Sequence, residues 1–143
     1  MILGIGVDLT QVARFEKWVS SPNLVNRFFN QNELCTASSF SVNCQHYAVR
    51  FAAKEAFGKA LGTGILGFDL KDVYIIKDSA GRPSLKVEKS AAELLKKICG
   101  KCKLHVSLSH EKEYAIAYVI IESVWLFMGD KIKTVENVAS FYL

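Results

Sequence analysis

The sequence predicts an α+β fold in which a small, mainly antiparallel sheet packs against helices. Short segments alternate apolar and polar residues, as half-buried strands do, and longer segments repeat apolar residues at helical spacing. The two kinds of segment alternate irregularly, without the regular strand–helix–strand series of a parallel sheet. The chain has 143 residues, of which 50% are apolar or aromatic and 22% are charged. These values fit one globular domain and exclude disordered, collagen-like and fibrous chains.

Two elements are predicted near the N-terminus. Residues 1–8 alternate as a strand with one apolar face, and Gly4 and Gly6 on its other face allow another backbone to approach closely. Thr10 is placed to cap a helix from about 11 to 20. The apolar side of this helix faces inward with Val12, Phe15, Trp18 and Val19. Its basic residues Arg14 and Lys17 face solvent.

A long helix is predicted in the middle of the chain. Three features precede it: a break at 21–23, a short helix over 31–38 and a polar loop over 38–45. Asn30 and Glu33 have the spacing of a capping box that opens the short helix. The long helix runs from about 46 to 61 and ends at the Gly-Thr-Gly of 62–64. One arc is apolar (Val49, Ala52, Ala53, Ala56, Phe57 and Ala60), and the opposite arc carries Arg50, Lys54, Glu55, Gly58 and Lys59.

The remaining elements complete the α+β pattern. In order they are a strand over 72–77, a turn over 78–83, a strand over 84–87, a helix over 88–99, and strands over 104–109 and 113–122. The last strand is apolar enough to be covered on both sides. We therefore predict one domain over residues 1–122 and a C-terminal extension over 123–143.

Charge and targeting signals restrict the location and partners. The net charge is +4, and the basic run over 82–103 has no interleaved aromatic residues, which favours a solvated surface over a nucleic-acid site. The N-terminus does not resemble a signal peptide, and the apolar stretch over 114–128 is interrupted by Glu122 and Ser123. We expect a cytoplasmic protein without a membrane segment, with its four cysteines reduced. Cys99 and Cys102 have the spacing of a redox or zinc half-site, but no second pair matches them.

Two carboxylates stand out by their surroundings. Asp8 ends an apolar strand, and Glu55 lies among basic residues with Lys59 one helical turn later. Asp8 can act as a cap for the next helix, and Glu55 and Lys59 can form a surface ion pair. Alternatively, the two carboxylates are oxygen ligands for Mg²⁺, with Arg50, Lys54 and Lys59 as a phosphate cradle. His105 and His110 bracket a polar strand and fit either structural hydrogen bonding or a site in a groove.

Four segments together resemble the holo-(acyl-carrier-protein) synthases, the small stand-alone bacterial 4′-phosphopantetheinyl transferases. They occur in the order and spacing of that family and cover roughly residues 1–122: MILGIGVDLTQVARF, RFAAKEAFGKALGTGI, GRP and HVSLSHEKEYAIAYVIIE. The resemblance implies an enzyme of fatty-acid biosynthesis with a phosphopantetheinyl transferase-like fold. It implies Mg²⁺-dependent transfer of the 4′-phosphopantetheine arm of coenzyme A to a serine of apo acyl carrier protein, with release of 3′,5′-ADP.

The resemblance also implies roles for the matching residues. Asp8 and Glu55 bind the metal, and the coenzyme contacts are Arg50, Lys59, Gly81, Pro83, Ser109 and His110. The catalytic group comprises Glu55, Lys59 and His105. The base that takes the serine proton is Glu55 directly, Glu55 or Asp8 through a metal-bound water, or His105. Arg14, with Lys17, docks the acidic carrier protein, and a homotrimer with sites at its subunit interfaces is expected.

Three other functions remain as alternatives. A relative could modify a carrier other than that of fatty-acid synthesis. A catalytically silent module could hold coenzyme A or a carrier without reacting. A basic nucleic-acid module could use residues 86–103, in which case its affinity would fall steeply with salt.

Overall fold

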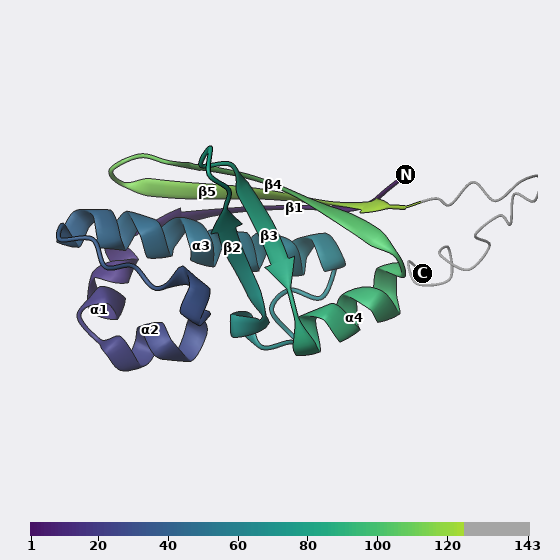
Figure 1. The fold of residues 1–143 in the computed structure, drawn as a ribbon, viewed down its shortest axis with the longest axis horizontal. Helices are drawn as coiled ribbons and strands as arrows, with labels where there is room; N and C mark the ends of the chain where they lie inside the picture. Colours follow the sequence, from purple (N-terminus) through teal and green to yellow (C-terminus); the bar gives the residue numbers. More distant parts are fainter. Residues whose placement is uncertain (125–143) are drawn as a thin grey trace, which may run out of the picture.

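The computed structural model describes residues 1–124, and it has the expected α+β architecture (Figure 1). A three-stranded antiparallel sheet has the order β1-β5-β4, with β1 at Ile2–Gln11, β5 at Tyr114–Ser123 and β4 at Cys102–His110. The long helix α3 (Phe40–Leu61) runs along one face of this sheet. Beyond α3 lie the hairpin of β2 (Val73–Lys77) and β3 (Pro83–Val87), the short 3-10 helix η3 (Leu70–Asp72) and helix α4 (Lys89–Cys99). The strands and helix predicted over residues 72–122 are therefore confirmed within two residues at each end.

Strand β1 lies unusually close to α3 because its inner face carries glycines. A Cβ atom added at Gly4 would come within 2.0 Å of the main-chain oxygen of Ala60. One added at Gly6 would come within 1.9 Å of the main-chain oxygen of Ala56. Both distances are far below van der Waals contact, so any side chain there would force the helix away. The predicted close approach of two backbones is confirmed.

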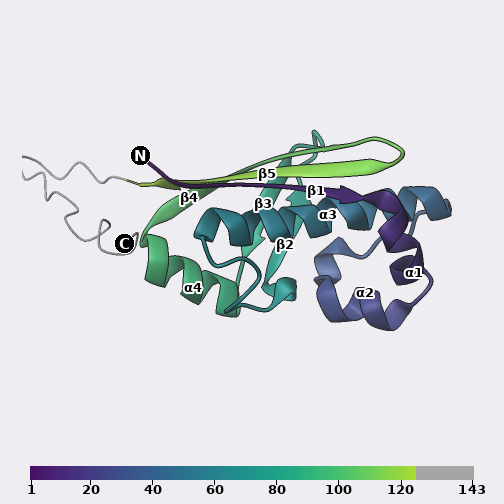
Figure 2. The same ribbon diagram turned by 180° about the vertical axis from the view of Figure 1, so that it is seen from behind.

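The other face of the sheet is apolar and open in the single chain. In β5, alternate residues are buried against α3, and the residues between them are exposed. The exposed set, here called the outer sheet face, is Ile5, Val7, Leu9, Ile116 and Tyr118. Within residues 1–124 no element packs on this face (Figure 2). The prediction that the last strand is covered on both sides is thus wrong for the isolated chain, and the apolar side of β1 faces outward.

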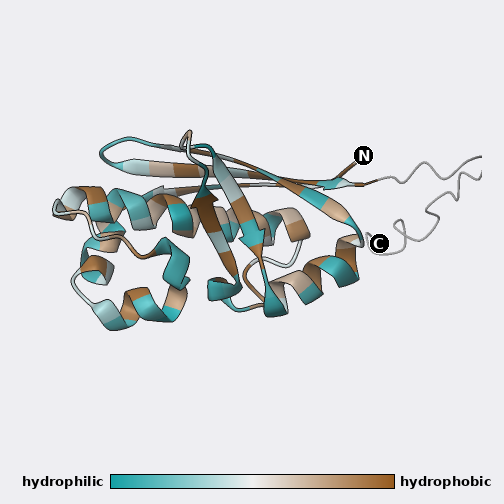
Figure 3. Ribbon diagram, in the orientation of Figure 1, coloured by the Kyte–Doolittle hydropathy of each residue, from teal (hydrophilic) through white to brown (hydrophobic). Residues whose placement is uncertain are grey.

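The hydrophobic core has two parts, and α3 contributes to both. One part joins the C-terminal half of α3 to the sheet, the hairpin and α4, and it includes Phe57, Val73 and Ile121. The other joins the N-terminal half of α3 to the first helices, with Phe15 and Phe29 almost completely buried. Apolar residues occur along α3 and α4 and in the strands of the hairpin (Figure 3). None of the helices described here is long and apolar enough to cross a membrane.

A buried ion pair ties α3 to the hairpin. Lys54 Nζ lies 2.6 Å from Glu33 Oε2, and neither side chain is exposed. The amine also donates to the main-chain oxygens of Leu70, at 3.0 Å, and Val73. Glu33 in turn accepts from the main-chain nitrogens of Asn30 and Ile75, both at 3.1 Å. The capping box predicted at Asn30 and Glu33 is therefore present, and its carboxylate also fixes the first strand of the hairpin.

The first predicted helix is interrupted. Strand β1 extends to Gln11, and the next residues form the 3-10 helix η1 (Val12–Phe15) and the single-turn helix α1 (Glu16–Val19). Thr10 lies in the strand and does not cap the helix, which starts without a side-chain cap. The predicted inward and outward sides of this helical segment are confirmed. Val12 and Phe15 are buried, Trp18 and Val19 pack against them, and Arg14 and Lys17 are exposed.

Residues 21–45 contain more helix than the sequence predicts. Helix α2 (Pro22–Phe28) starts with proline at its first position, where the missing N–H costs nothing. The helix predicted over 31–38 is only the 3-10 helix η2 (Gln31–Glu33). The predicted loop over 38–45 is wrong after its first residues, because α3 already begins at Phe40 with Ser39 as its cap. The predicted extension over 123–143 lies almost entirely outside the described residues, and the domain boundary stays a prediction.

Candidate active site

Two carboxylates and a lysine meet where β1 lies against α3. Asp8 is on the inner face of β1, and its Oδ1 accepts a hydrogen bond of 2.9 Å from Lys59 Nζ. The same amine donates to the main-chain oxygen of Val7 at 3.0 Å. Glu55 lies one turn before Lys59 on α3 and is half-buried. We call Asp8, Glu55 and Lys59 the carboxylate cluster. The structure brings the three residues together, but the ion pair that it shows joins Lys59 to Asp8 and not to Glu55.

The electrostatics of the cluster favour a bound cation. Burial, and after it the negative charge of Asp8, raises the pKa of Glu55 above its usual value. The charges of Lys59 and Arg14 act in the opposite direction but do not reverse the shift. Two carboxylates that destabilise each other's charge provide oxygen ligands of the kind Mg²⁺ takes in proteins. Residues 1–124 hold no group of three or more metal-binding side chains, so a Mg²⁺ ion would complete its shell with water and substrate oxygens.

The two predicted docking residues border this cluster differently. Arg14 is exposed, and its Nη1 donates a hydrogen bond of 3.2 Å to Thr10 Oγ1. Its positive charge acts against the rise in the pKa of Glu55. Lys17 is also exposed, and within residues 1–124 its side chain has no hydrogen bond or ion pair. Arg14 is therefore held beside the cluster, whereas Lys17 projects freely.

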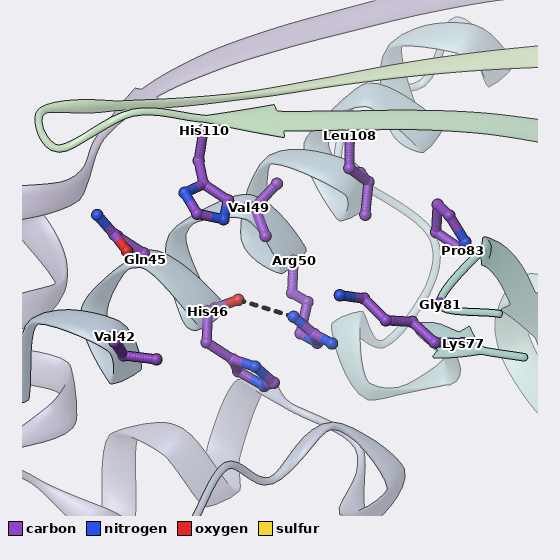
Figure 4. Close-up of a pocket in the computed structure, with 10 residues that line it drawn as sticks. All are labelled: Val42, Gln45, His46, Val49, Arg50, Lys77, Gly81, Pro83, Leu108 and His110. Atoms are coloured by element: carbon purple, nitrogen blue, oxygen red, sulfur yellow. Dashed lines mark hydrogen bonds between the residues drawn. The ribbon is translucent and has the colours of Figure 1, made fainter. Parts of the chain in front are cut away.

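A separate cavity of about 330 Å³ opens between α3, β4 and the hairpin (Figure 4). Basic side chains from all three elements line it, so we call it the cationic pocket: Arg50 from α3, His110 from β4, and Lys77 from the hairpin, with Gly81 and Pro83 at the hairpin turn. Gly81 adopts a φ of 82°, in the left-handed region that favours glycine. The structure thus assembles four of the predicted coenzyme contacts around one cavity.

Arg50 is the buried cation of this pocket. Only 8% of its surface is exposed, and its Nη1 donates to the main-chain oxygen of His46 at 3.2 Å (Figure 4). Its Nε atom is buried without a hydrogen-bond partner in the described residues. Burial lowers the pKa of Arg50, and the charge of Glu33 opposes that shift. A buried guanidinium with an unused donor beside a cavity is suited to an anionic ligand.

The carboxylate cluster and the cationic pocket lie on different sides of the molecule. Asp8 belongs to β1 and His110 to β4, and these strands are the two opposite edges of the sheet. On α3, Glu55 follows Arg50 by five residues, which turns it about 140° around the helix axis. One chain therefore presents two partial sites rather than one closed site.

A family model of the 4′-phosphopantetheinyl transferase superfamily matches residues 4–119. The chain belongs to this superfamily. Among curated relatives, the holo-(acyl-carrier-protein) synthase of Treponema denticola is 50% identical over 123 residues, covering 85% of this chain and 99% of the relative. That of a Geobacter species is 45% identical over 126 residues, with the same coverage of 85% and 99%.

Solved structures agree with the transferase fold. The holo-(acyl-carrier-protein) synthase of Neisseria meningitidis superposes with a TM-score of 0.76 at 30% identity, covering 86% of this chain and 100% of that one. The synthase of Bacillus anthracis, described as in complex with CoA (3′,5′-ADP), gives 0.69 at 33% identity, covering 87% and 99%. The fold class predicted from the sequence is therefore confirmed, together with membership of the transferase family.

Two predicted residues of this transferase lie away from both partial sites. Along β4, the side chains of His105 and Ser109 point to the outer sheet face, whereas His110 points to the α3 side. His105 Nε2 lies 2.7 Å from Glu122 Oε2 on that outer face. The sequence already indicates that His105 and His110 lie on opposite faces, because they are an odd number of positions apart in one strand. Within one chain neither residue reaches the carboxylate cluster, and their roles in the site stay predictions.

The pocket of the transferase also contains residues that sequence reasoning missed. Lys77 and His46 line it, and Gln45 lies next to His46 at its mouth. His46 precedes Arg50 by one helical turn and lies at the start of the predicted long helix, so its i, i+4 spacing to Arg50 is a signal that the sequence already contains. Lys77 is the last residue of β2, so it follows from the hairpin once the pocket is known.

Proposed function

We propose that this transferase moves the 4′-phosphopantetheine group of coenzyme A to a serine of an apo acyl carrier protein, in a Mg²⁺-dependent reaction that releases 3′,5′-ADP. The serine oxygen forms a bond to the phosphorus that carries the pantetheine arm. The bond from that phosphorus to the bridging oxygen of the diphosphate breaks, and the serine proton passes to a base. Membership of the superfamily and the names of its relatives support the reaction class.

The observation that carries the proposal is the cationic pocket, in which the Nε atom of the buried Arg50 has no hydrogen-bond partner in the described residues. Coenzyme A is a polyanion, and Arg50 and Lys77 bring positive charge to a cavity that His110 also lines, which suits an anionic ligand. Gly81 and Pro83 border the cavity at the hairpin turn without bulky side chains, so a flat or extended group can lie against them. We assign the coenzyme phosphates to Arg50 and its neighbours, and the turn to the rest of the nucleotide.

The carboxylate cluster is the proposed reaction centre. Asp8 and Glu55 would hold Mg²⁺, which when bound neutralises charge on the diphosphate oxygens. Lys59 is a half-exposed cation beside Asp8 and can stabilise negative charge on the departing ADP. Glu55 is our candidate for the base, because its half-buried carboxyl lies in this cluster and has no hydrogen bond within residues 1–124. Asp8 is the alternative, and His105 would have to act from another chain.

The carrier protein is expected at the edge formed by η1 and α1. Acyl carrier proteins are acidic, and Arg14 and Lys17 present two exposed positive charges there. Arg14 lies beside the cluster, so a carrier bound at this edge would bring its serine close to Glu55. The four cysteines are free thiols, which fits the cytoplasm as the compartment of the reaction.

We further propose that the enzyme is a homotrimer whose active sites are shared between neighbouring subunits. The outer sheet face supports this, because five large apolar side chains of one chain are otherwise exposed to water. The opposite placement of the cluster and the pocket supports it as well, since the β1 edge of one copy can meet the β4 edge of the next. A shared site would also give His105 and Ser109 access to a neighbour's reaction centre.

Intact-mass spectrometry of an apo acyl carrier protein tests the reaction. The carrier is incubated with this protein, coenzyme A and Mg²⁺, and a parallel sample contains EDTA. We expect the mass to increase by one phosphopantetheine, and the increase to disappear with EDTA. A carrier whose acceptor serine is replaced by alanine is the negative control. Absence of transfer to several carriers by a folded protein would favour a silent coenzyme-binding module, and transfer only to another type of carrier would favour the alternative specificity.

Complementation tests the shared site. Glu55→Gln disables the cluster and Arg50→Ala disables the pocket, so each variant alone should be inactive. If sites form between subunits, mixing and re-equilibrating the two variants creates some sites with both halves intact, and activity returns. If each chain carries its own complete site, the mixture stays inactive. Light scattering after size-exclusion chromatography gives the subunit number independently.

A further inference from the structure

Thr10 has a buried hydroxyl whose partner is an exposed arginine. Only 3% of the Thr10 surface is exposed. Its side chain lies on the same inner face of β1 as that of Asp8, which precedes it by two residues. Its Oγ1 accepts the hydrogen bond of 3.2 Å from Arg14 Nη1. No other hydrogen bond to this hydroxyl is found among residues 1–124. The contact thus links β1, which carries Asp8, to η1, which carries the proposed docking residue Arg14.

This bond restrains a side chain that would otherwise move freely. Arginine has many rotamers, and fixing one of them when a partner binds costs conformational entropy. One guanidinium nitrogen of Arg14 is engaged with Thr10, and its remaining donors stay available on an exposed residue. The restrained guanidinium is bonded to the same inner face of β1 that carries Asp8. Lys17, three residues after Arg14, has no such restraint among residues 1–124.

We propose that Thr10 is a positioning residue for carrier recognition. Its hydroxyl holds the Arg14 guanidinium at the edge of the carboxylate cluster, preorganised to receive an acidic group of the carrier protein next to the reaction centre. Thr10 itself touches neither substrate. The inference rests on the proposed function and adds to it the device that aims the docking arginine.

The alternative is that the bond only satisfies a buried hydroxyl and stabilises the fold. The two roles differ in which kinetic constant changes. Loss of a positioning residue weakens recognition of the carrier and leaves recognition of coenzyme A intact. Loss of a structural bond lowers the melting temperature and changes all constants together, or none.

The test is a set of variants assayed with carrier and coenzyme A varied separately. Thr10→Val keeps the shape and removes the hydroxyl, and Thr10→Ser keeps the hydroxyl. We expect Thr10→Val to raise KM for the carrier about threefold to tenfold, because the Arg14 side chain must then be ordered when the carrier binds. KM for coenzyme A should stay at the wild-type value, and Thr10→Ser should restore most of the carrier affinity. Equal rises in both KM values would overturn the proposal.

Matched backgrounds make the test specific to Arg14. In an Arg14→Ala background, Thr10→Val should cause no further rise in KM for the carrier, because the bond is already absent. In a Lys17→Ala background, which removes an equally exposed charge on the same segment, Thr10→Val should keep its full effect. An equal effect of Thr10→Val in both backgrounds contradicts the proposal.

A surface variant guards against a misfolded strand. Arg14→Lys keeps the positive charge outside the core but lacks the planar guanidinium that spans Thr10 and a carboxylate. We expect its KM for the carrier to rise as in Thr10→Val with an unchanged melting temperature, and a wild-type KM overturns the inference. The wild-type enzyme separates the two levels: if it transfers no phosphopantetheine, the proposed function and this inference fall together, and if it does, a failed variant series removes this inference alone.

Discussion

Helix α3 carries two lysines five residues apart, and each pairs with a carboxylate from a distant segment. Lys54 and Glu33 are 2.6 Å apart, and both side chains are completely buried. Lys59 and Asp8 are 2.9 Å apart, with 50% of the Lys59 side chain and 16% of the Asp8 side chain exposed. The chemical groups are the same, so the differences between the pairs come from their surroundings.

The buried pair has every neighbour fixed by the protein. Lys54 donates to Glu33 and to two main-chain oxygens, and Glu33 accepts from two main-chain nitrogens. The exposed pair leaves room for water, metal or substrate. The other carboxylate of the cluster, Glu55, has no hydrogen bond within residues 1–124. A buried pair whose hydrogen bonds are all made holds elements together. A partly exposed pair with an unbonded carboxylate beside it is available for chemistry.

The largest expected effect is on turnover when the second carboxylate is neutralised. Glu55→Gln removes a metal ligand and the proposed base but keeps the size of the side chain. We expect kcat to fall about 10³-fold or more, the size of effect seen when such groups are lost. The midpoint of urea unfolding should stay the same or rise, because the repulsion from Asp8 disappears. A variant that retains turnover within about tenfold of wild type would refute the assigned role.

The next effect is on stability when the buried pair is broken. Lys54→Met fills the same space but leaves the Glu33 carboxylate buried without a cation. We expect the free energy of unfolding to fall by about 3 to 5 kcal/mol, measured by urea denaturation. Adding Glu33→Gln should recover part of this loss, since a neutral amide needs no counter-charge. Equal stability of Lys54→Met and wild type would mean that the pair does not hold α3 to the hairpin.

Truncation of the exposed lysine sharpens the comparison, because loss of this positive charge should affect turnover more than stability. Lys59→Ala removes a half-exposed ion pair, which contributes at most about 1 kcal/mol to stability. Loss of its charge beside the leaving group should lower kcat about 10²-fold. Steady-state kinetics and urea unfolding on one preparation measure both. A stability loss as large as that of Lys54→Met would show that the two pairs are alike.

The sequence predicts the exposed pair better than the buried one. Asp8, Glu55 and Lys59 were recognised because carboxylates among basic residues stand out on an apolar strand and on a helix. Lys54 was placed on the polar arc of the same helix, since the helical period alone cannot show that α3 is surrounded on nearly all sides. Its burial depends on the hairpin and on Glu33, which are tertiary contacts without a local signal.

The errors in the fold have the same origin. Short helices such as α2 are stable only because Val25 and its neighbours pack against α3, and local propensity does not reveal that packing. The odd spacing of His105 and His110 was available in the sequence and would have separated their faces. The continuous apolar run of β5 predicts a strand covered on both sides, but the sequence does not show whether the same chain supplies the second cover.

The smallest expected effect concerns pH and the residue that connects the buried pair to the pocket. His46 Nε2 donates a hydrogen bond of 2.6 Å to the main-chain oxygen of Glu33, and Arg50 donates to the main-chain oxygen of His46. Burial, and after it the charge of Arg50, lowers the pKa of His46 to about 4 from its ordinary value of 6.5. The folded protein therefore holds this ring neutral at a pH where the unfolded chain protonates it.

The sign of the effect on stability follows from proton binding. Between pH 4 and 6.5 the unfolded state binds more protons at His46 than the folded state, so stability is fully present above pH 6.5 and is lost as the pH falls toward 4. Solvent screening of the half-buried ring limits the loss to about 1 to 2 kcal/mol. His46→Gln keeps a donor to Glu33 but cannot titrate, so the fall in unfolding free energy from pH 7 to pH 4.5 should be smaller in the variant. Parallel pH curves for wild type and variant would instead place the acid sensitivity among the carboxylates, and the buried pair would then be independent of the pocket.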